Sequence, residues 1–187
     1  MEVRLATWLE TPVIDQRDKR WKALMLGNSD STIGAYGCLL SCFSMLAGIT
    51  PPEMNSRMIA SAAFGVGDCP ACANTFDIRK MLATRAPPIA DYSGRYPYSP
   101  FPAASSARLV AWLKRGNVAI LEVDINPNNN THEMHFVLGV SAFGNGDTAN
   151  IIIADPWHGD QTTLVPRYGV NLARAIVRAI YYGEGTP

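Results

Sequence analysis

Apolar and polar residues in the first half of the chain alternate with the period of a helix. Directly after Cys38, one helix face is formed by Leu39, Leu40, Phe43 and Leu46. Helix starts are expected at Cys38, at a Thr-Pro-Pro-Glu capping box at 50–53, near Asn74, and at Ser105 or Ser106. The second helix should run to about Phe64, the third through Met81 and Leu82, and the fourth to Gly116.

The second half of the chain has the pattern of strands, rich in β-branched and aromatic residues. Strands are expected at 118–125, 135–143, 150–157, 162–165 and 174–182, the last of which also fits a helix. The sequence GNGD at 144–147 predicts a hairpin turn between the second and third strands. Helices followed by an antiparallel sheet indicate an α+β domain, with an N-terminal helical layer packed on a C-terminal antiparallel β-sheet.

One segment between these halves does not fit a regular element. Residues 86–104 contain five of the 13 prolines together with several aromatic residues, which excludes a regular helix or a central strand. This segment is either a surface loop or the wall of a cleft that grips an extended ligand. The CPAC sequence at 69–72 is expected to form a tight turn. No repeat or linker divides the chain, so a single domain is expected over 1–187, with its core at about 14–182.

Composition narrows the class of protein. A hydrophobic fraction of 48% indicates a chain that forms a core, and 16 basic residues balance 16 acidic ones. No basic run indicates a nucleic-acid partner, and no apolar run is long enough for a membrane span. The first residues contain no apolar core of a secretory signal, so a cytoplasmic location is the default expectation. Release without a signal, or incorporation into a virion, would leave no such mark.

Three residues of different elements suggest nucleophilic catalysis. Cys38 is expected in the first turn of its helix, where free N–H groups and the helix dipole favour a thiolate. His135 begins one strand and Asp155 ends the next, so the hairpin should place them side by side. A cysteine nucleophile needs such a base and a carboxylate that orients it.

Four separated motifs then carry a family resemblance. QRDKRW, STIGAYGCLLSCFSML, MHFVLGV and IADPWHGD resemble, in this order, the C39-like branch of the papain-like cysteine peptidases. The resemblance covers Gln16 to about Asp160 and implies a papain-like fold. It implies that Cys38 is the nucleophile, that His135 is the general base and acid, and that Asp155 orients the histidine. It also implies that Gln16 donates its side-chain amide to the oxyanion, beside the backbone N–H of Cys38.

The spacing of the motifs separates this chain from one part of that family. In C39 domains that remove leader peptides during export, the glutamine lies a few residues before the cysteine and a membrane transporter follows. Here Gln16 lies 22 positions before Cys38 and no span follows. The chain therefore resembles the free-standing group, whose members are attached to cell-wall-degrading and phage proteins. The resemblance implies a peptide or protein substrate, with peptidoglycan stem peptides and isopeptides among the candidates, and no cofactor. It also suggests a place in a larger assembly such as a phage particle.

Two alternatives remain open from the sequence. Cys38, Cys42, Cys69 and Cys72 give the pattern C-x₃-C and C-x₂-C, which fits a structural zinc site and would make the protein a zinc-stapled binding module. That alternative leaves His135 and Asp155 unexplained. The second alternative is a non-catalytic papain-like domain kept only for binding.

Overall fold

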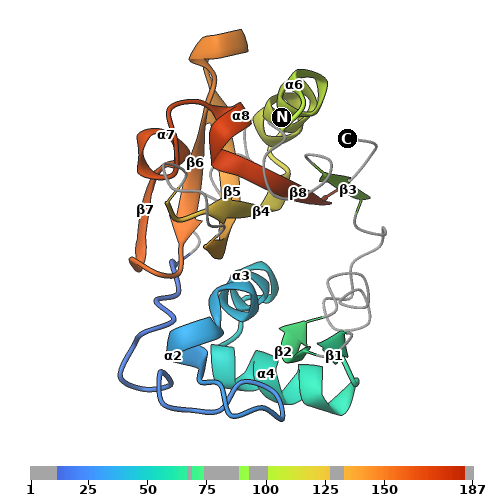
Figure 1. Ribbon diagram of the computed structural model, residues 1–187, viewed down its shortest axis with the longest axis vertical. Coiled ribbons are helices and arrows are strands. Elements are labelled where there is room, and N and C mark those ends of the chain that lie inside the picture. Colours follow the sequence, from blue (N-terminus) through green and yellow to red (C-terminus); the bar gives the residue numbers. More distant parts are fainter. Residues whose placement is uncertain (1–11, 67–68, 74–88, 93–100, 127–132, 184–187) are drawn as a thin grey trace.

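The computed structural model describes residues 12–66, 69–73, 89–92, 101–126 and 133–183. These residues form an α+β structure in two parts (Figure 1). The lower part contains α2, α3 and α4 with a short β-hairpin, and the upper part contains an antiparallel sheet with α6, α7 and α8. The expected α+β class, with helices first and an antiparallel sheet after them, is confirmed.

The sheet has six strands in the order β3-β8-β4-β5-β6-β7, and every neighbouring pair is antiparallel. Its strands are β3 (Ile89–Tyr92), β4 (Val118–Asp124), β5 (Met134–Phe143), β6 (Asn150–Asp155), β7 (Asp160–Thr163) and β8 (Ile176–Tyr182). The sequence 174–182, which also fitted a helix, contains the central strand β8 after the short helix α8 (Leu172–Ala175). The GNGD turn contains a 3₁₀ turn, Gly146–Thr148, that connects β5 to β6.

The lower part brings the cysteine helix against the sheet. It consists of α2 (Ile33–Tyr36), α3 (Cys38–Ala47), α4 (Pro51–Ala60) and the hairpin β1–β2 (Phe64–Val66 and Cys69–Ala73). The helix α3 begins at Cys38, as expected, and ends at Gly48 in the left-handed conformation with φ of 65°. Its apolar face packs against β5.

The sheet is covered on both faces, which explains why β4 is an almost continuous apolar run. One face, with Ile120 and Leu138, packs against Phe43 of α3. The other face, with Leu121 and Val137, packs against α6 (Ala103–Lys114), α7 (Leu164–Arg167) and α8. The expected two layers are therefore three, because α6, which was expected in the N-terminal helical layer, covers the second face together with α7 and α8.

Several expected boundaries were wrong for local reasons. The helix α4 begins at Pro51, but the capping box at 50–53 does not form, because the Thr50 side chain makes no capping hydrogen bond. The helix α4 ends at Ala60, and the chain then turns through Ala62, which has φ of 52°. The helix α6 begins at Ala103 after Pro102, ahead of the serines expected to cap it.

The irregular segments differ from expectation in one place and agree in another. The CPAC sequence, expected as a tight turn, forms most of strand β2. Within 86–104, residues 89–92 form β3, which lies at the edge of the sheet and not in its centre, and Ala103 and Ala104 begin α6. The helix expected through Met81 and Leu82 lies outside the described residues.

Candidate active site

Cys38 occupies the first position of α3, immediately after a glycine that the local geometry requires. Gly37 is the N-cap residue, and its N–H donates to the carbonyl of Ile33 at 2.7 Å. A Cβ on Gly37 would lie 2.4 Å from that carbonyl oxygen, so a side chain there would force the backbone to move. Cys38 is partly buried, and its N–H is among the first N–H groups of the helix, which have no intrahelical acceptor.

The His135 imidazole and the Asp155 carboxylate meet at the end of the β5–β6 hairpin. Nε2 of His135 lies 2.9 Å from Oδ1 of Asp155, and both side chains are almost completely buried. Because Leu138 pairs with Ala154, His135 lies diagonally across from Asp155 and not directly opposite. The sequence predicted the pair but not this register, which a bulge next to Gly139 and the 3₁₀ turn together determine.

Cys38 also affects the pKa of the His135 imidazole. Burial alone would lower the pKa of His135, but the hydrogen bond to Asp155 and the interaction with Cys38 outweigh it and raise the pKa from 6.5 to about 9. Since Nε2 is bound to Asp155, Nδ1 is the ring nitrogen left to face the sulfur. The structure therefore brings the cysteine, the histidine and the aspartate together in the order that the sequence predicted.

Asp155 is bound at both carboxylate oxygens. Oδ1 accepts from His135 and from the backbone N–H of Trp157 at 3.0 Å. Oδ2 accepts from Nη1 of Arg167 at 3.0 Å and from the hydroxyl of Tyr168 at 2.5 Å. Burial opposes ionisation, but these donors outweigh it and lower the pKa of Asp155 well below its ordinary value. Asp155 is therefore ionised at neutral pH, where it accepts hydrogen bonds and orients His135.

Gln16 connects the two parts of the site. Its backbone N–H donates to the carbonyl of Pro156 at 2.9 Å, and its side-chain Nε2 donates to the carbonyl of Gly34 at 3.1 Å. The first bond holds it beside the strand end of Asp155, and the second beside the turn that precedes Cys38. An amide nitrogen carries two N–H groups, and the described residues accept from one of them. Although it lies in a charged loop, Gln16 is only 1% exposed.

Trp157 closes the histidine off on one side. Its ring contacts His135 edge to face, with 6.5 Å between the ring centroids. The guanidinium of Arg17 lies over the Trp157 ring, with its Cζ 4.8 Å from the ring centroid. Gly159 lets this loop approach the segment before Gln16, because a Cβ there would lie 2.8 Å from Cβ of Asp15.

The second cysteine of α3 has a different environment. Cys42 is completely buried, and burial, followed by the charges of Cys38 and Asp155, raises the pKa of its thiol. A zinc ligand must be a thiolate, so this environment opposes the zinc alternative. Among the described side chains, no group of three or more His, Cys, Asp or Glu residues is placed to hold a metal ion. The side chains of Cys69 and Cys72 are not among those described.

Sequence reasoning missed two residues that contact the site. Arg167 and Tyr168 follow β7, and the ring of Tyr168 lies 5.7 Å from that of His135. No periodicity or motif identified them, because a short helix after an edge strand carries them to Asp155. Of the other two histidines, His158 is exposed and His132 lies outside the described residues.

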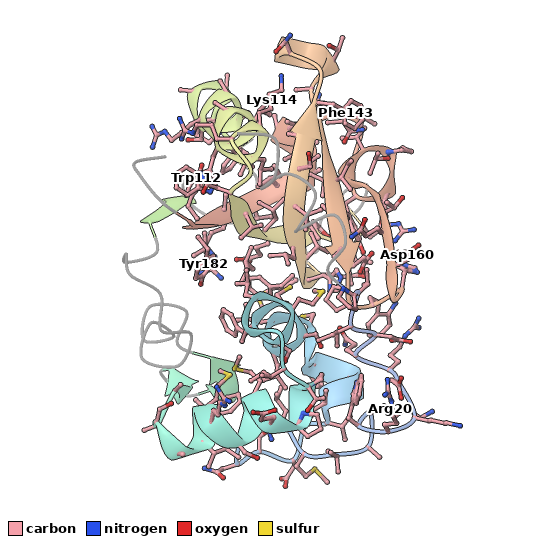
Figure 2. The ribbon with its side chains drawn as sticks, turned by 180° about the vertical axis from the view of Figure 1, so that it is seen from behind. Arg20, Trp112, Lys114, Phe143, Asp160 and Tyr182 are labelled. Carbon is pink, nitrogen blue, oxygen red and sulfur yellow. The ribbon has the colours of Figure 1, made fainter. Side chains whose placement is uncertain are left out.

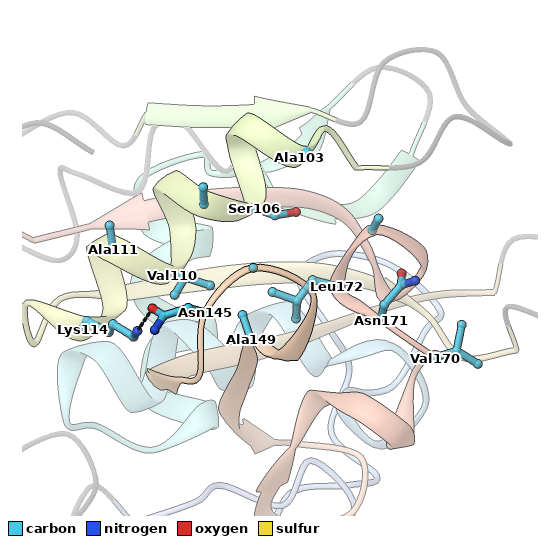
Figure 3. Close-up of a pocket in the computed structure, with 13 residues that line it drawn as sticks. Ala103, Ser106, Val110, Ala111, Lys114, Asn145, Ala149, Val170, Asn171 and Leu172 are labelled. Atoms are coloured by element: carbon cyan, nitrogen blue, oxygen red, sulfur yellow. Dashed lines mark hydrogen bonds between the residues drawn. The ribbon is translucent and has the colours of Figure 1, made fainter.

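A separate hollow lies on the opposite face of the sheet. It has a volume of about 520 Å³ and lies between α6, the 3₁₀ turn and the start of α8 (Figure 3). Its walls include Val110, Ala149 and Leu172, and Lys114 closes one end by binding Asn145 at 2.9 Å. None of the four candidate site residues lines it.

Comparison with protein-family models and with curated proteins gives no match. Within the described part of the chain, no helix has the length and apolar character needed to cross a membrane. The functional assignment therefore depends on the geometry of the site and on its chemistry.

Proposed function

We propose that the protein is a cysteine peptidase or amidase with a papain-like, C39-like catalytic domain. The observation that carries the proposal is the buried His135–Asp155 pair next to Cys38 at the start of a helix. A histidine that keeps its proton up to about pH 9 beside a cysteine favours a thiolate–imidazolium pair at neutral pH.

The proposed reaction is acyl transfer to Cys38 and then to water. The thiolate adds to an amide carbonyl, and the resulting oxyanion accepts hydrogen bonds from the Cys38 N–H and from Nε2 of Gln16. His135 gives its proton to the leaving amine as the C–N bond breaks. It then takes a proton from a water molecule, which attacks the thioester and releases the acid and the thiolate. Asp155 stays ionised throughout.

The two alternatives gain less support from the same residues. A zinc-stapled module would require Cys42 as a thiolate, against the effect of its burial. A non-catalytic domain has no need for an ionised Asp155 that is bound at both oxygens and oriented towards His135. One tightly held zinc per chain in elemental analysis would favour the zinc module over the peptidase.

The proposed substrates are peptides or proteins, with peptidoglycan stem peptides and isopeptides included in the class. A place in a larger assembly such as a phage particle, and a cytoplasmic location before assembly, are parts of the same proposal. The neutral balance of charge does not select among these substrates.

The test uses pooled peptides of varied sequence, including stem peptides with D-residues, and mass spectrometry to detect new termini. We expect cleavage by the wild-type protein and by Cys42→Ala, and none by Cys38→Ala. The Cys42 variant is the matched control, because it removes a thiol one helical turn away on the same helix. Cleavage that persists in Cys38→Ala would overturn the assignment of the nucleophile.

A further inference from the structure

We propose that Arg167 is a positioning residue that holds Asp155 in place for His135 by separating it from a second carboxylate, Asp160. This inference rests on the proposed cysteine chemistry and adds to it a residue that touches neither the cysteine nor the histidine. Its basis is a like-charge pair that the sheet itself creates.

The hairpin of β6 and β7 places Asp155 directly opposite Asp160 in the sheet register. Like charges in directly opposed positions repel each other, and the buried member of the pair carries the larger cost. Asp155 is completely buried, whereas Asp160 is about half exposed, at the outer edge of the sheet (Figure 2).

Arg167 of α7 binds both carboxylates. Its Nη1 and Nη2 donate to Oδ1 and Oδ2 of Asp160 at 2.6 and 2.9 Å, and Nη1 also donates to Oδ2 of Asp155 at 3.0 Å. This fork geometry is specific to a guanidinium, because a lysine ammonium cannot present two parallel N–H groups. Asp160 therefore anchors the cation, and the cation restrains Asp155.

The other hydrogen-bond donors to Asp155 differ from Arg167 in their charge or in the oxygen that they bind. His135 and the Trp157 N–H bind Oδ1, and the Tyr168 hydroxyl binds Oδ2 without bringing a charge. Among the charged or titratable groups that act on this cluster, Cys38 interacts with His135, the buried Cys42 of α3 is affected by the charge of Asp155, and His158 acts on Asp160. Besides the imidazolium of His135, Arg167 is the cation that binds Asp155 among the described residues.

Loss of the positive charge of Arg167 should raise the pKa of Asp155. Without Arg167, the two carboxylates face each other, so the Asp155 carboxylate takes up a proton at a higher pH. His135 then loses its anionic partner, and the thiolate–imidazolium pair fails at a higher pH than in the wild-type protein. A purely structural contribution would lower the folded fraction without moving this acid limit in the molecules that remain folded.

The experiment measures the rate of Cys38 alkylation by iodoacetamide against pH, with peptide mass spectrometry, in the folded protein. We expect Arg167→Met to move the acid midpoint of the rate upwards by about one pH unit, the size of effect that a close opposite charge produces. Arg167→Lys keeps the positive charge but loses the two parallel N–H groups, and should return the midpoint most of the way to the wild-type value. Arg57→Met removes an arginine from an exposed pair with Glu53 on α4 and should leave the midpoint unchanged.

The outcomes separate this inference from the proposed function. If the wild-type profile shows the acid limit and Arg167→Met leaves it in place, the positioning role is overturned while the catalytic proposal stands. If Cys38 of the wild-type protein reacts as an ordinary thiol at every pH, the thiolate–imidazolium pair itself is absent and both proposals fail. Circular dichroism of each variant shows that the molecules assayed are folded, and Arg167→Gln, which also removes the charge, provides the test if Arg167→Met does not fold.

Discussion

His135 is buried, yet its environment favours the protonated form. Burial disfavours the imidazolium, and the two hydrogen-bond partners, Asp155 and Cys38, reverse that effect. The same carboxylate would be costly to bury if its oxygens were not all bound. The chemistry proposed for Cys38 therefore depends on side chains that keep Asp155 ionised and fixed.

The candidate site residues and the pairing of His135 with Asp155 could be predicted from the sequence, but the other contacts of Asp155 could not. Cys38, His135 and Asp155 stand at the ends of recognisable elements, and hairpin geometry makes the last two neighbours. Gln16 was expected from the family resemblance, since a glutamine in a charged loop has no local signal. Arg167 was missed because its role depends on a tertiary contact between α7 and Asp155.

We predict that Gln16→Ala slows peptide cleavage strongly without changing the alkylation of Cys38. Loss of one oxyanion donor reduces turnover by about 10²–10³. Alkylation by iodoacetamide is a displacement at carbon and forms no carbonyl oxyanion, so its rate should stay at the wild-type value. Steady-state kinetics and per-cysteine alkylation measure the two rates. A parallel loss of both would show that Gln16 supports the fold of the site and not the oxyanion.

The junction of α2 and α3 decides where the nucleophile lies. The chain must turn at Gly37 without a Cβ, because the carbonyl of Ile33 occupies that space. The spacing of apolar residues reveals neither such a close approach nor the absence of a side-chain cap before the prolines that begin α4. Element type could be predicted from the sequence for α3 and the central strands, whereas boundaries near Pro and Gly could not.

We predict that Gly37→Ala lowers both stability and the reactivity of Cys38. The added methyl group would meet backbone at 2.4 Å, and overpacking of this kind costs roughly 1–3 kcal/mol. Gly48→Ala at the other end of α3 is the matched control. It faces open space and costs about 1 kcal/mol through its left-handed conformation.

Urea unfolding measures the stability of both variants, and alkylation measures the site. Gly48→Ala should keep the wild-type reactivity of Cys38, since it leaves the first turn of α3 in place. If Cys38 reacts in Gly37→Ala at the wild-type rate, the candidate site tolerates a shift of this turn.

The whole molecule places its candidate site where the two parts meet. Gln16 and Cys38 belong to the helical part and contact the strand ends that carry His135 and Asp155, and α3 lies next to the sheet (Figure 1). The class of architecture followed from the order of helix and strand patterns, but the second helical layer did not. The helix α6 was expected, but its pattern does not say which face of the sheet it covers. The helices α7 and α8 are each four residues long, too short to give a periodic signal.

The two shifted groups also predict how the stability of the molecule depends on pH. Asp155, whose pKa is lowered in the folded state, stabilises the fold above its ordinary pKa of 3.8, and this contribution is lost as the pH falls. His135, whose pKa is raised, stabilises it fully below 6.5, and this contribution is lost as the pH rises through about 9. The alkaline loss is on the order of 3 kcal/mol. Stability should therefore be greatest between about pH 4 and 6.5.

Urea unfolding across this range, compared with Asp155→Asn, measures the effect. We expect the variant to have a flatter profile on both sides, because both shifts depend on the Asp155 carboxylate. An unchanged profile in Asp155→Asn would mean that other groups control the pH dependence.

The most direct test of the account is the alkylation of Cys38 at about pH 6 in the wild-type protein and in His135→Ala. An ordinary thiol with a pKa of about 8.5 is less than about 1% ionised at that pH. If His135 activates Cys38, Cys38 should react rapidly in the wild-type protein. Its rate should fall by about tenfold or more in His135→Ala, because the imidazolium no longer stabilises the thiolate. Equal rates in the two proteins would show that His135 does not activate Cys38, and would contradict the proposed cysteine chemistry.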